Sequence, residues 1–113
     1  MLNKMVALAF CLIVLSPGTV LAGEVKALRV TVLSTMLADR GLGEWGYSAL
    51  VEVDGHKFLF DTGANPDVVL KNAMSLKIDL SQVTDVVISH NHADHTGGLI
   101  TLRRELMKRN PRQ

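Results

Sequence analysis

The sequence predicts an α/β fold for residues 23–113. Short runs rich in valine, leucine and isoleucine, typical of strands, share this region with two stretches whose apolar residues recur at helical spacing. Asp54-Gly55, placed between two alternating runs, is typical of a tight β-hairpin turn. Strands and helices that follow one another in this way indicate a sheet packed against helices.

Four strands are expected. Residues 25–34 are rich in Val and Leu and form the first, and residues 47–53 and 56–60 form the two arms of the hairpin. Residues 84–89 form a fourth strand, and the family resemblance described below implies that residues 83–89 are buried. Between the first two strands, residues 35–46 are rich in glycine and mixed in charge, so we expect a loop there.

Two helices are expected on either side of the fourth strand. Asn65 followed by Pro66 predicts the start of the first, because Asn caps helices and Pro suits the first helical position. This helix would run to about Leu76. The second covers residues 97–109, and its spacing predicts a sheet-facing row formed by Leu99, Leu102 and Leu106.

Residues 1–22 are predicted to be a signal peptide. Lys4 supplies a positive start, residues 5–15 are apolar but too short for the roughly 20 residues that span a bilayer, and Val20-Leu21-Ala22 suits signal peptidase. Cleavage after Ala22 would also remove Cys11, the only cysteine. No cysteine follows the cleavage site, so no stable membrane anchor is expected, and the product would be periplasmic or secreted.

The charge of residues 23–113 is balanced. Removing Lys4 from the 12 basic residues leaves 11, against 11 acidic ones. A basic stripe is therefore not expected, which argues against nucleic acid as the main partner. The basic residues near the C-terminus are expected to form the solvated face of the last helix.

Residues 90–95, His-Asn-His-Ala-Asp-His, form a cluster that we call the histidine motif, and they are followed by Thr96-Gly97-Gly98. Imidazole and carboxylate together suit Zn²⁺. In an extended backbone, positions two residues apart point the same way, so His90 and His92 can share one ion. Asp94 and His95 would follow a bend and serve a second ion. A polar loop with histidines by chance is the weaker interpretation, because solvated loops rarely concentrate histidine.

The histidine motif with its two glycines resembles the signature of the metallo-β-lactamase superfamily. Residues 58–63, Phe-Leu-Phe-Asp-Thr-Gly, resemble the second landmark of that family, a strand that ends in Asp-x-Gly beside the metals. Residues 44–48, this turn and residues 78–81 further resemble the branch of dihydropterin-ribofuranosyl-aminobenzene-phosphate synthase-like metal hydrolases.

This resemblance implies the N-terminal half of a four-layer αββα metallo-β-lactamase sandwich over residues 23–113. It also implies two zinc ions per complete domain and a hydroxide that attacks an ester, lactone, thioester, lactam or phosphoester of a small-molecule substrate. His90, His92, Asp94 and His95 would be metal ligands, and Asp94 would also act catalytically by orienting the attacking water or accepting its proton. Asp61 would accept hydrogen bonds from the backbone or from a ligand imidazole, whose tautomer it would fix. Diiron relatives have Glu where His92 stands, so zinc is favoured.

Two alternatives remain open from the sequence. Residues 58–64 also resemble the active-site turn of retroviral-type aspartic proteases, in which Asp61 from two subunits would pair. The chain is also short for the superfamily, whose further ligands come from downstream segments. It would then be an inactive metal-binding fragment, or would need a separate chain or a missing C-terminal half. His56 is expected at the surface, and Trp45 and Tyr47 either line a substrate mouth or pack.

Overall fold

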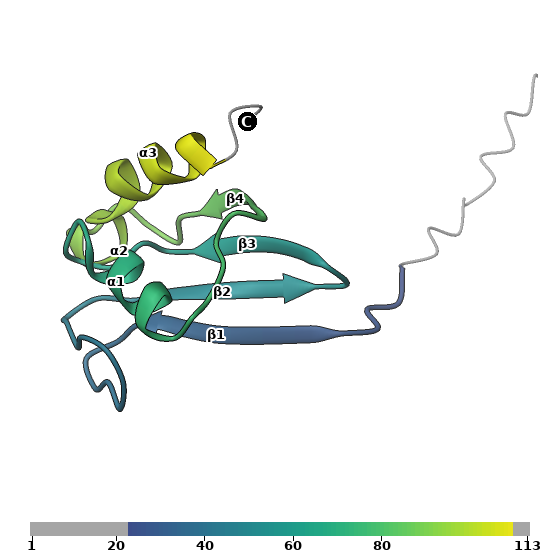
Figure 1. The fold of residues 1–113 in the computed structure, drawn as a ribbon, viewed down its shortest axis with the longest axis horizontal. Coiled ribbons are helices and arrows are strands. Elements are labelled where there is room, and N and C mark those ends of the chain that lie inside the picture. The colour runs from purple at the N-terminus through teal and green to yellow at the C-terminus, as the bar shows by residue number, and fades with distance from the viewer. Residues whose placement is uncertain (1–22, 110–113) are drawn as a thin grey trace, which may run out of the picture.

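The computed structural model describes residues 23–109, so the predicted signal peptide and residues 110–113 lie outside the described part. Its elements are four strands and three helices (Figure 1). The strands are β1 (Leu28–Ser34), β2 (Ser48–Val53), β3 (His56–Phe60) and β4 (Val83–Val87). The helices are α1 (Val68–Ser75), α2 (Ala93–Thr96) and α3 (Leu99–Arg109). The predicted α/β class is correct.

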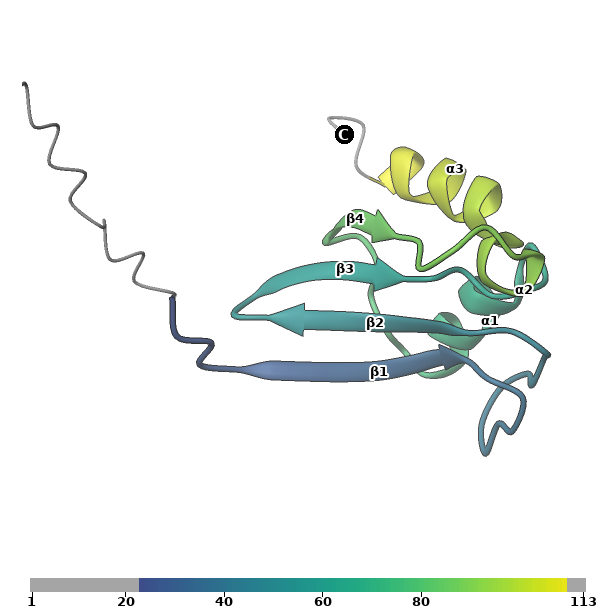
Figure 2. The same ribbon diagram turned by 180° about the vertical axis from the view of Figure 1, so that it is seen from behind.

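The strands form one sheet in the order β1-β2-β3-β4. β1, β2 and β3 pair antiparallel, and β4 pairs parallel to β3 after the chain crosses over through α1. Asp54 and Gly55 both have positive φ, 48° and 88°, as the tight turn of the β2–β3 hairpin requires. Strands β1, β3 and β4 therefore end on the same side of the sheet, and the loops that follow them lie close together there (Figure 2).

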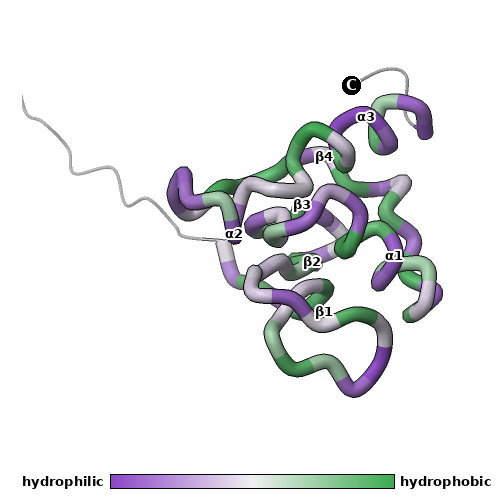
Figure 3. Tube along the Cα trace, turned by 90° about the vertical axis from the view of Figure 1, so that its left-hand side faces the viewer, coloured by the Kyte–Doolittle hydropathy of each residue, from purple (hydrophilic) through white to green (hydrophobic). Residues whose placement is uncertain are grey.

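The hydrophobic core lies between the sheet and the helices. Figure 3, which looks along the strands, shows α1 and α3 on one side of the sheet. Each strand and both long helices contribute to the core, which consists of Leu33, Leu50, Leu59, Val69, Ala73, Leu80, Val83, Leu102 and Leu106. Leu102 and Leu106 confirm the predicted sheet-facing row of the last helix, whereas Leu99 is only half-buried.

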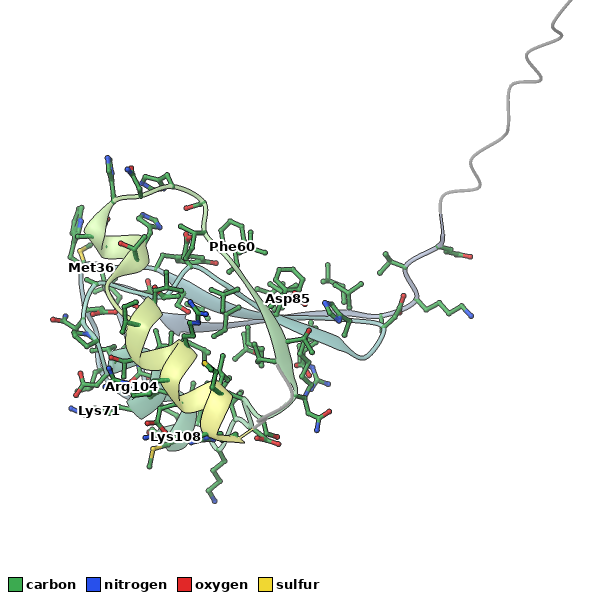
Figure 4. All side chains as sticks on the ribbon, turned by 90° about the horizontal axis from the view of Figure 1, so that it is seen from above. Met36, Phe60, Lys71, Asp85, Arg104 and Lys108 are labelled. Carbon is green, nitrogen blue, oxygen red and sulfur yellow. The ribbon has the colours of Figure 1, made fainter. Side chains whose placement is uncertain are left out.

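The other face of the sheet is not covered by any helix or strand of residues 23–109. Cross-strand pairs such as Val30 with Val51 and Val51 with Phe58 place one row of apolar side chains there. Figure 4 shows Phe60 on the side of the sheet away from α3. We call this surface the open sheet face, formed by Leu28, Val30, Val32, Val51, Val53, Phe58, Phe60 and Val87.

Two sequence predictions about these elements were wrong. Helix α1 begins at Val68 with Asp67 as its N-cap, because the side chain of Asn65 bonds a distant carboxylate instead of capping the helix. Strand β4 is largely exposed, since it is the edge strand and one of its faces belongs to the open sheet face. The resemblance implied a buried strand, but the order of strands in the sheet decides how exposed β4 is.

Within residues 23–109, no helix is long and apolar enough to cross a membrane.

Candidate metal centre

The candidate site is built at the carboxyl ends of the parallel strands β3 and β4. Phe60, the last residue of β3, leads into residues 61–65, which we call the aspartate turn; Val87, the last residue of β4, leads into the histidine motif. The N–H of Asp61 donates to the carbonyl of Val87 (2.8 Å), so the two segments leave the sheet side by side. Residues 61–65 and 90–95 are therefore neighbours in space although far apart in sequence.

Asp61 is the centre of the hydrogen bonding in this site. Its side chain is 1% exposed, and its backbone has a positive φ of 58°, a strained conformation for a residue other than glycine. One carboxylate oxygen accepts the N–H of Ser89 (2.7 Å), and the other accepts the Ser89 hydroxyl (2.8 Å) and lies 2.7 Å from Nδ1 of His95. Burial raises the pKa of Asp61, but the donors on Ser89 and His95 together hold it below its ordinary value.

This network assigns the protonation of two imidazoles. The carboxylate can only accept, so Nδ1 of His95 has the proton. The Ser89 hydroxyl donates its one proton to Asp61, so it accepts from Nδ1 of His90 at 2.9 Å. In the neutral form of each imidazole the proton on Nδ1 leaves Nε2 unprotonated, which is the form in which histidine binds a metal.

The motif's side chains lie close to one another at the protein surface. The ring of His90 lies 4.5 Å from that of His92 and 4.2 Å from that of His95, centre to centre. Nε2 of His95 is 3.5 Å from a carboxylate oxygen of Asp94. Asp94 and His95 lie in the short helix α2 rather than after a simple bend. Residues 23–109 nevertheless contain no group of three or more His, Cys, Asp or Glu side chains arranged to hold a metal ion.

The donor set fits zinc in kind, since three imidazoles and one carboxylate are typical zinc ligands. The ring of His90 lies close to the rings of both His92 and His95, so these distances do not separate the side chains into the two predicted pairs.

Two glycines bring the histidine motif into contact with the aspartate turn. The N–H of Gly97 donates to the carbonyl of Gly63 (2.8 Å), and both the N–H and the hydroxyl of Thr62 donate to the carbonyl of His95 (2.8 and 2.9 Å). A Cβ on Gly97 would overlap the carbonyl of Ala64, and one on Gly98 would overlap that of Thr62. The Gly-Gly pair thus permits backbone contact between the two segments.

The loop expected over residues 35–46 is present, and it overhangs this site. Residues 35–47, which we call the tryptophan loop, are held by the buried side chain of Asn72 on α1, whose amide donates to the carbonyls of Leu33 and Leu42 (both 2.8 Å). A shallow hollow of about 270 Å³ lies between the loop and the motif, lined by Thr35, Met36, Trp45, Gly46, Tyr47, Asp94 and His95. Trp45 is 73% exposed, so it lines this hollow rather than packing in the core.

Other sequence expectations have clear outcomes. His56 lies at the surface, as predicted, with Nε2 3.3 Å from a carboxylate oxygen of Asp85. Ser89 and Asn72 were not recognised as functional or organising residues. A serine directly before the histidine motif is the one local feature that could have indicated Ser89, whereas the role of Asn72 depends on a loop 30 residues away in sequence.

Residues 46–110 match the family model of the metallo-β-lactamase superfamily. The chain belongs to this superfamily. It is similar to 7,8-dihydropterin-6-methyl-4-(β-D-ribofuranosyl)-aminobenzene-5'-phosphate synthase of Methanocaldococcus jannaschii, with 32% identity over 79% of this chain and 33% of the relative. It is also similar to ribonuclease Z of Borreliella burgdorferi (40% identity, 47% of this chain, 16% of the relative) and to an anti-Pycsar protein of Saccharibacillus brassicae (38%, 46%, 20%).

Both predicted resemblances, to the superfamily and to the synthase-like branch, are thereby confirmed. This metallo-β-lactamase superfamily chain spans a third or less of the length of these relatives. Its mixed sheet with helices on one face is consistent with part of the superfamily fold. The aspartic protease alternative loses its support, because a buried Asp61 already bonded to Ser89 and His95 cannot pair with a second subunit's carboxylate.

Proposed function

We propose that this chain is the N-terminal half of an exported, zinc-dependent hydrolase and provides part of its metal ligands. The observation that supports the proposal is the hydrogen-bond network in which Asp61 and Ser89 fix the tautomers of His95 and His90. Imidazoles that are already held in one orientation lose little conformational entropy when a metal binds to Nε2. His90, His92, Asp94 and His95 are the proposed ligands, and two zinc ions are proposed for a complete domain.

Zinc held by these residues would lower the pKa of a bound water to about 7, and hydroxide would then be available at neutral pH. Asp94, whose side chain is 30% exposed and lies beside His95, is proposed to orient that water or accept its proton. Asp61 keeps the imidazole of His95 in one orientation. The proposed substrate is a small molecule with an ester, lactone, thioester, lactam or phosphoester bond, and it enters over the hollow below Trp45.

The complete domain is proposed to be the four-layer αββα sandwich, in which a second sheet covers the open sheet face. That sheet, and the remaining zinc ligands, would come from a C-terminal half or from a separate chain. By itself the present chain offers each ion two protein donors, so we expect it to bind zinc weakly and to show no turnover.

Zinc content tests the proposed ligands. After gel filtration in buffer with limiting zinc, the wild-type chain is expected to retain more of the metal than the His92→Ala variant, because that substitution removes one of only two donors to an ion. His56→Ala is the matched control, since His56 is an exposed histidine remote from the motif. Elemental analysis with equal zinc in all three proteins would refute the proposed site.

Hydrolysis by this chain together with its completing half is expected to disappear with a chelator and to return when zinc is added. The reason is that the attacking hydroxide depends on the metal. Assays with thioester, lactone and phosphodiester substrates provide the measurement. Inhibition by a statine-type peptide combined with indifference to the chelator would restore the aspartic protease interpretation of Asp61.

Export is proposed with cleavage after Ala22, on the basis of the positive, apolar and small-residue pattern of residues 1–22. Material recovered outside the cytoplasm is expected to begin at Gly23-Glu24 by N-terminal sequencing. An Ala22→Lys variant, which breaks the small-residue rule at the cleavage site, should remain unprocessed. A soluble cytoplasmic product that retains Met1 would contradict the proposal.

A further inference from the structure

Glu44 is a buried carboxylate in the tryptophan loop, remote in sequence from the proposed metal ligands. It is 8% exposed and accepts four hydrogen bonds. One oxygen accepts the hydroxyl of Ser34 (2.6 Å) and the N–H of Ala64 (3.1 Å). The other accepts the backbone N–H of Asn65 (2.8 Å) and its side-chain amide (2.7 Å). Three of the four donors belong to the aspartate turn.

The charge of Glu44 is stabilised by these hydrogen bonds alone within the described chain. None of the ion pairs formed by residues 23–109 includes Glu44. Burying a charged group without an ion-pair partner costs free energy unless hydrogen bonds compensate for it. The Glu44 carboxylate therefore requires its four donors to stay in place. A residue that served only to fill space here would not need to be charged.

The aspartate turn needs to be held, because its backbone is unusual. Asp61 and Gly63 have positive φ values of 58° and 74°. The turn also passes so close to Glu44 that a Cβ on Gly63 would overlap its Oε1. A left-handed conformation at a residue other than glycine persists only when the surroundings impose it. The hydrogen bonds that Glu44 accepts from Ala64 and Asn65 fix the C-terminal end of this turn.

The residues after Glu44 extend this contact to the histidine motif. The N–H of Tyr47 donates to the carbonyl of Asp94 (3.1 Å), and the N–H of Gly63 donates to the carbonyl of Tyr47 (2.9 Å). A Cβ on Gly46 would lie 2.6 Å from the N of Ala64 and 3.0 Å from the O of Asp94. Residues 44–47 therefore lie between the aspartate turn and α2 and contact both.

We propose that Glu44 is a positioning residue for the Asp61–His95 pair. Its hydrogen bonds go to Ser34, Ala64 and Asn65 rather than to either side chain of the pair, and it acts by holding the aspartate turn so that the Asp61 carboxylate meets Nδ1 of His95. Its importance for zinc rests on the proposed function, whereas its effect on the Asp61–His95 hydrogen bond does not require a metal. The two consequences can therefore be measured separately.

Glu44→Gln is the informative substitution, because it keeps the size of the side chain and removes one acceptor. Whichever way the new amide is oriented, its NH₂ faces the N–H of Ala64 or that of Asn65, so one backbone donor loses its partner. Glu52→Gln is the matched control, since Glu52 is a partly buried carboxylate that pairs with Arg29 and Lys57 away from the site.

The first measurement uses the metal-free chain labelled with ¹⁵N-histidine, in which the four imidazoles can be resolved by NMR. The wild type and Glu52→Gln are expected to show a downfield, slowly exchanging Nδ1 proton for His95, and Glu44→Gln is expected to lose it. In the wild type the Asn65 amide donates to the Glu44 carboxylate. In the double variant Glu44→Gln with Asn65→Asp, the amide at position 44 can instead donate to the carboxylate at position 65. This double variant should recover part of the signal.

The second measurement is the zinc dissociation constant at a temperature where circular dichroism shows every variant folded. Glu44→Gln is expected to weaken zinc binding about tenfold, the lower end of the effect of residues that orient metal ligands, and the double variant to regain part of it. If Glu44→Gln does not fold, Ser34→Ala replaces it, because this variant removes a single donor and should speed exchange of the His95 proton.

A folded Glu44→Gln that keeps the wild-type His95 signal would overturn the inference, whatever its melting temperature. If Ser34→Ala has to replace it, an unchanged exchange rate would do the same. A wild-type chain that binds no zinc would instead refute the proposed function, while the NMR comparison would still decide the role of Glu44.

Discussion

Gly97→Ala is expected to destabilise the folded chain by about 3 kcal/mol, the upper part of the range for overpacked sites. The backbone of Gly97 is ordinary right-handed helix (φ −59°, ψ −35°), so helix propensity by itself favours alanine. The new Cβ would, however, overlap the carbonyl of Ala64, and backbone cannot move aside as a flexible side chain can. The clash therefore outweighs the gain in propensity.

Thermal unfolding followed by circular dichroism provides the measurement, and a loss of this size lowers the melting temperature of a small domain by roughly 15 °C. Gly23→Ala is the control, because nothing lies within 4 Å of a Cβ at that position. A melting temperature within 2 or 3 °C of the wild type would show that the histidine motif and the aspartate turn are not in rigid contact.

The second large effect concerns the open sheet face. Burial of apolar surface is worth about 25 cal/mol per Å², so a face of several hundred Å² left in water forgoes on the order of ten kcal/mol. That is comparable with the whole stability of a small domain, about 5–15 kcal/mol. We expect the isolated chain to be marginally stable or self-associated, and Val30→Lys, in the middle of β1, to shift it towards monomer.

Sedimentation velocity at several concentrations measures this shift. Met74→Lys is the matched control, because Met74 is an exposed apolar residue on α1 rather than on the sheet. It should leave the association unchanged. A wild-type chain that is monomeric, melts cooperatively and turns over substrate with zinc would show that the open sheet face needs no cover.

The order and type of the main elements could be predicted from the sequence because they depend on local patterns. The hairpin at Asp54-Gly55 and the leucine row of α3 are examples. The start of α1 could not, because Asn65 is recruited by Glu44, a residue 21 positions away. The exposure of β4 could not either, since an apolar run does not reveal whether a strand is central or at an edge.

The candidate site divides in the same way. The candidate ligands of the histidine motif lie within six consecutive residues, so the sequence alone shows their spacing. The Asp-Thr-Gly turn could be predicted because it resembles a landmark of the superfamily. The bonds that organise them join residues separated by 20 to 34 positions, such as Ala64 with Glu44 and Asp61 with His95. Such pairs become visible only when the sheet brings the ends of β1, β3 and β4 to one edge.

The position of Trp45 has a practical consequence. It is the only tryptophan of the chain, and it lies in the hollow beside Asp94 and His95 with most of its indole already in water. Intrinsic fluorescence will therefore report events at the site more than the integrity of the core. Denaturation should change the emission of Trp45 little, whereas a ligand that binds over the indole should quench or shift it. The fluorescence of Trp45 is therefore an intrinsic probe of binding at the candidate metal centre.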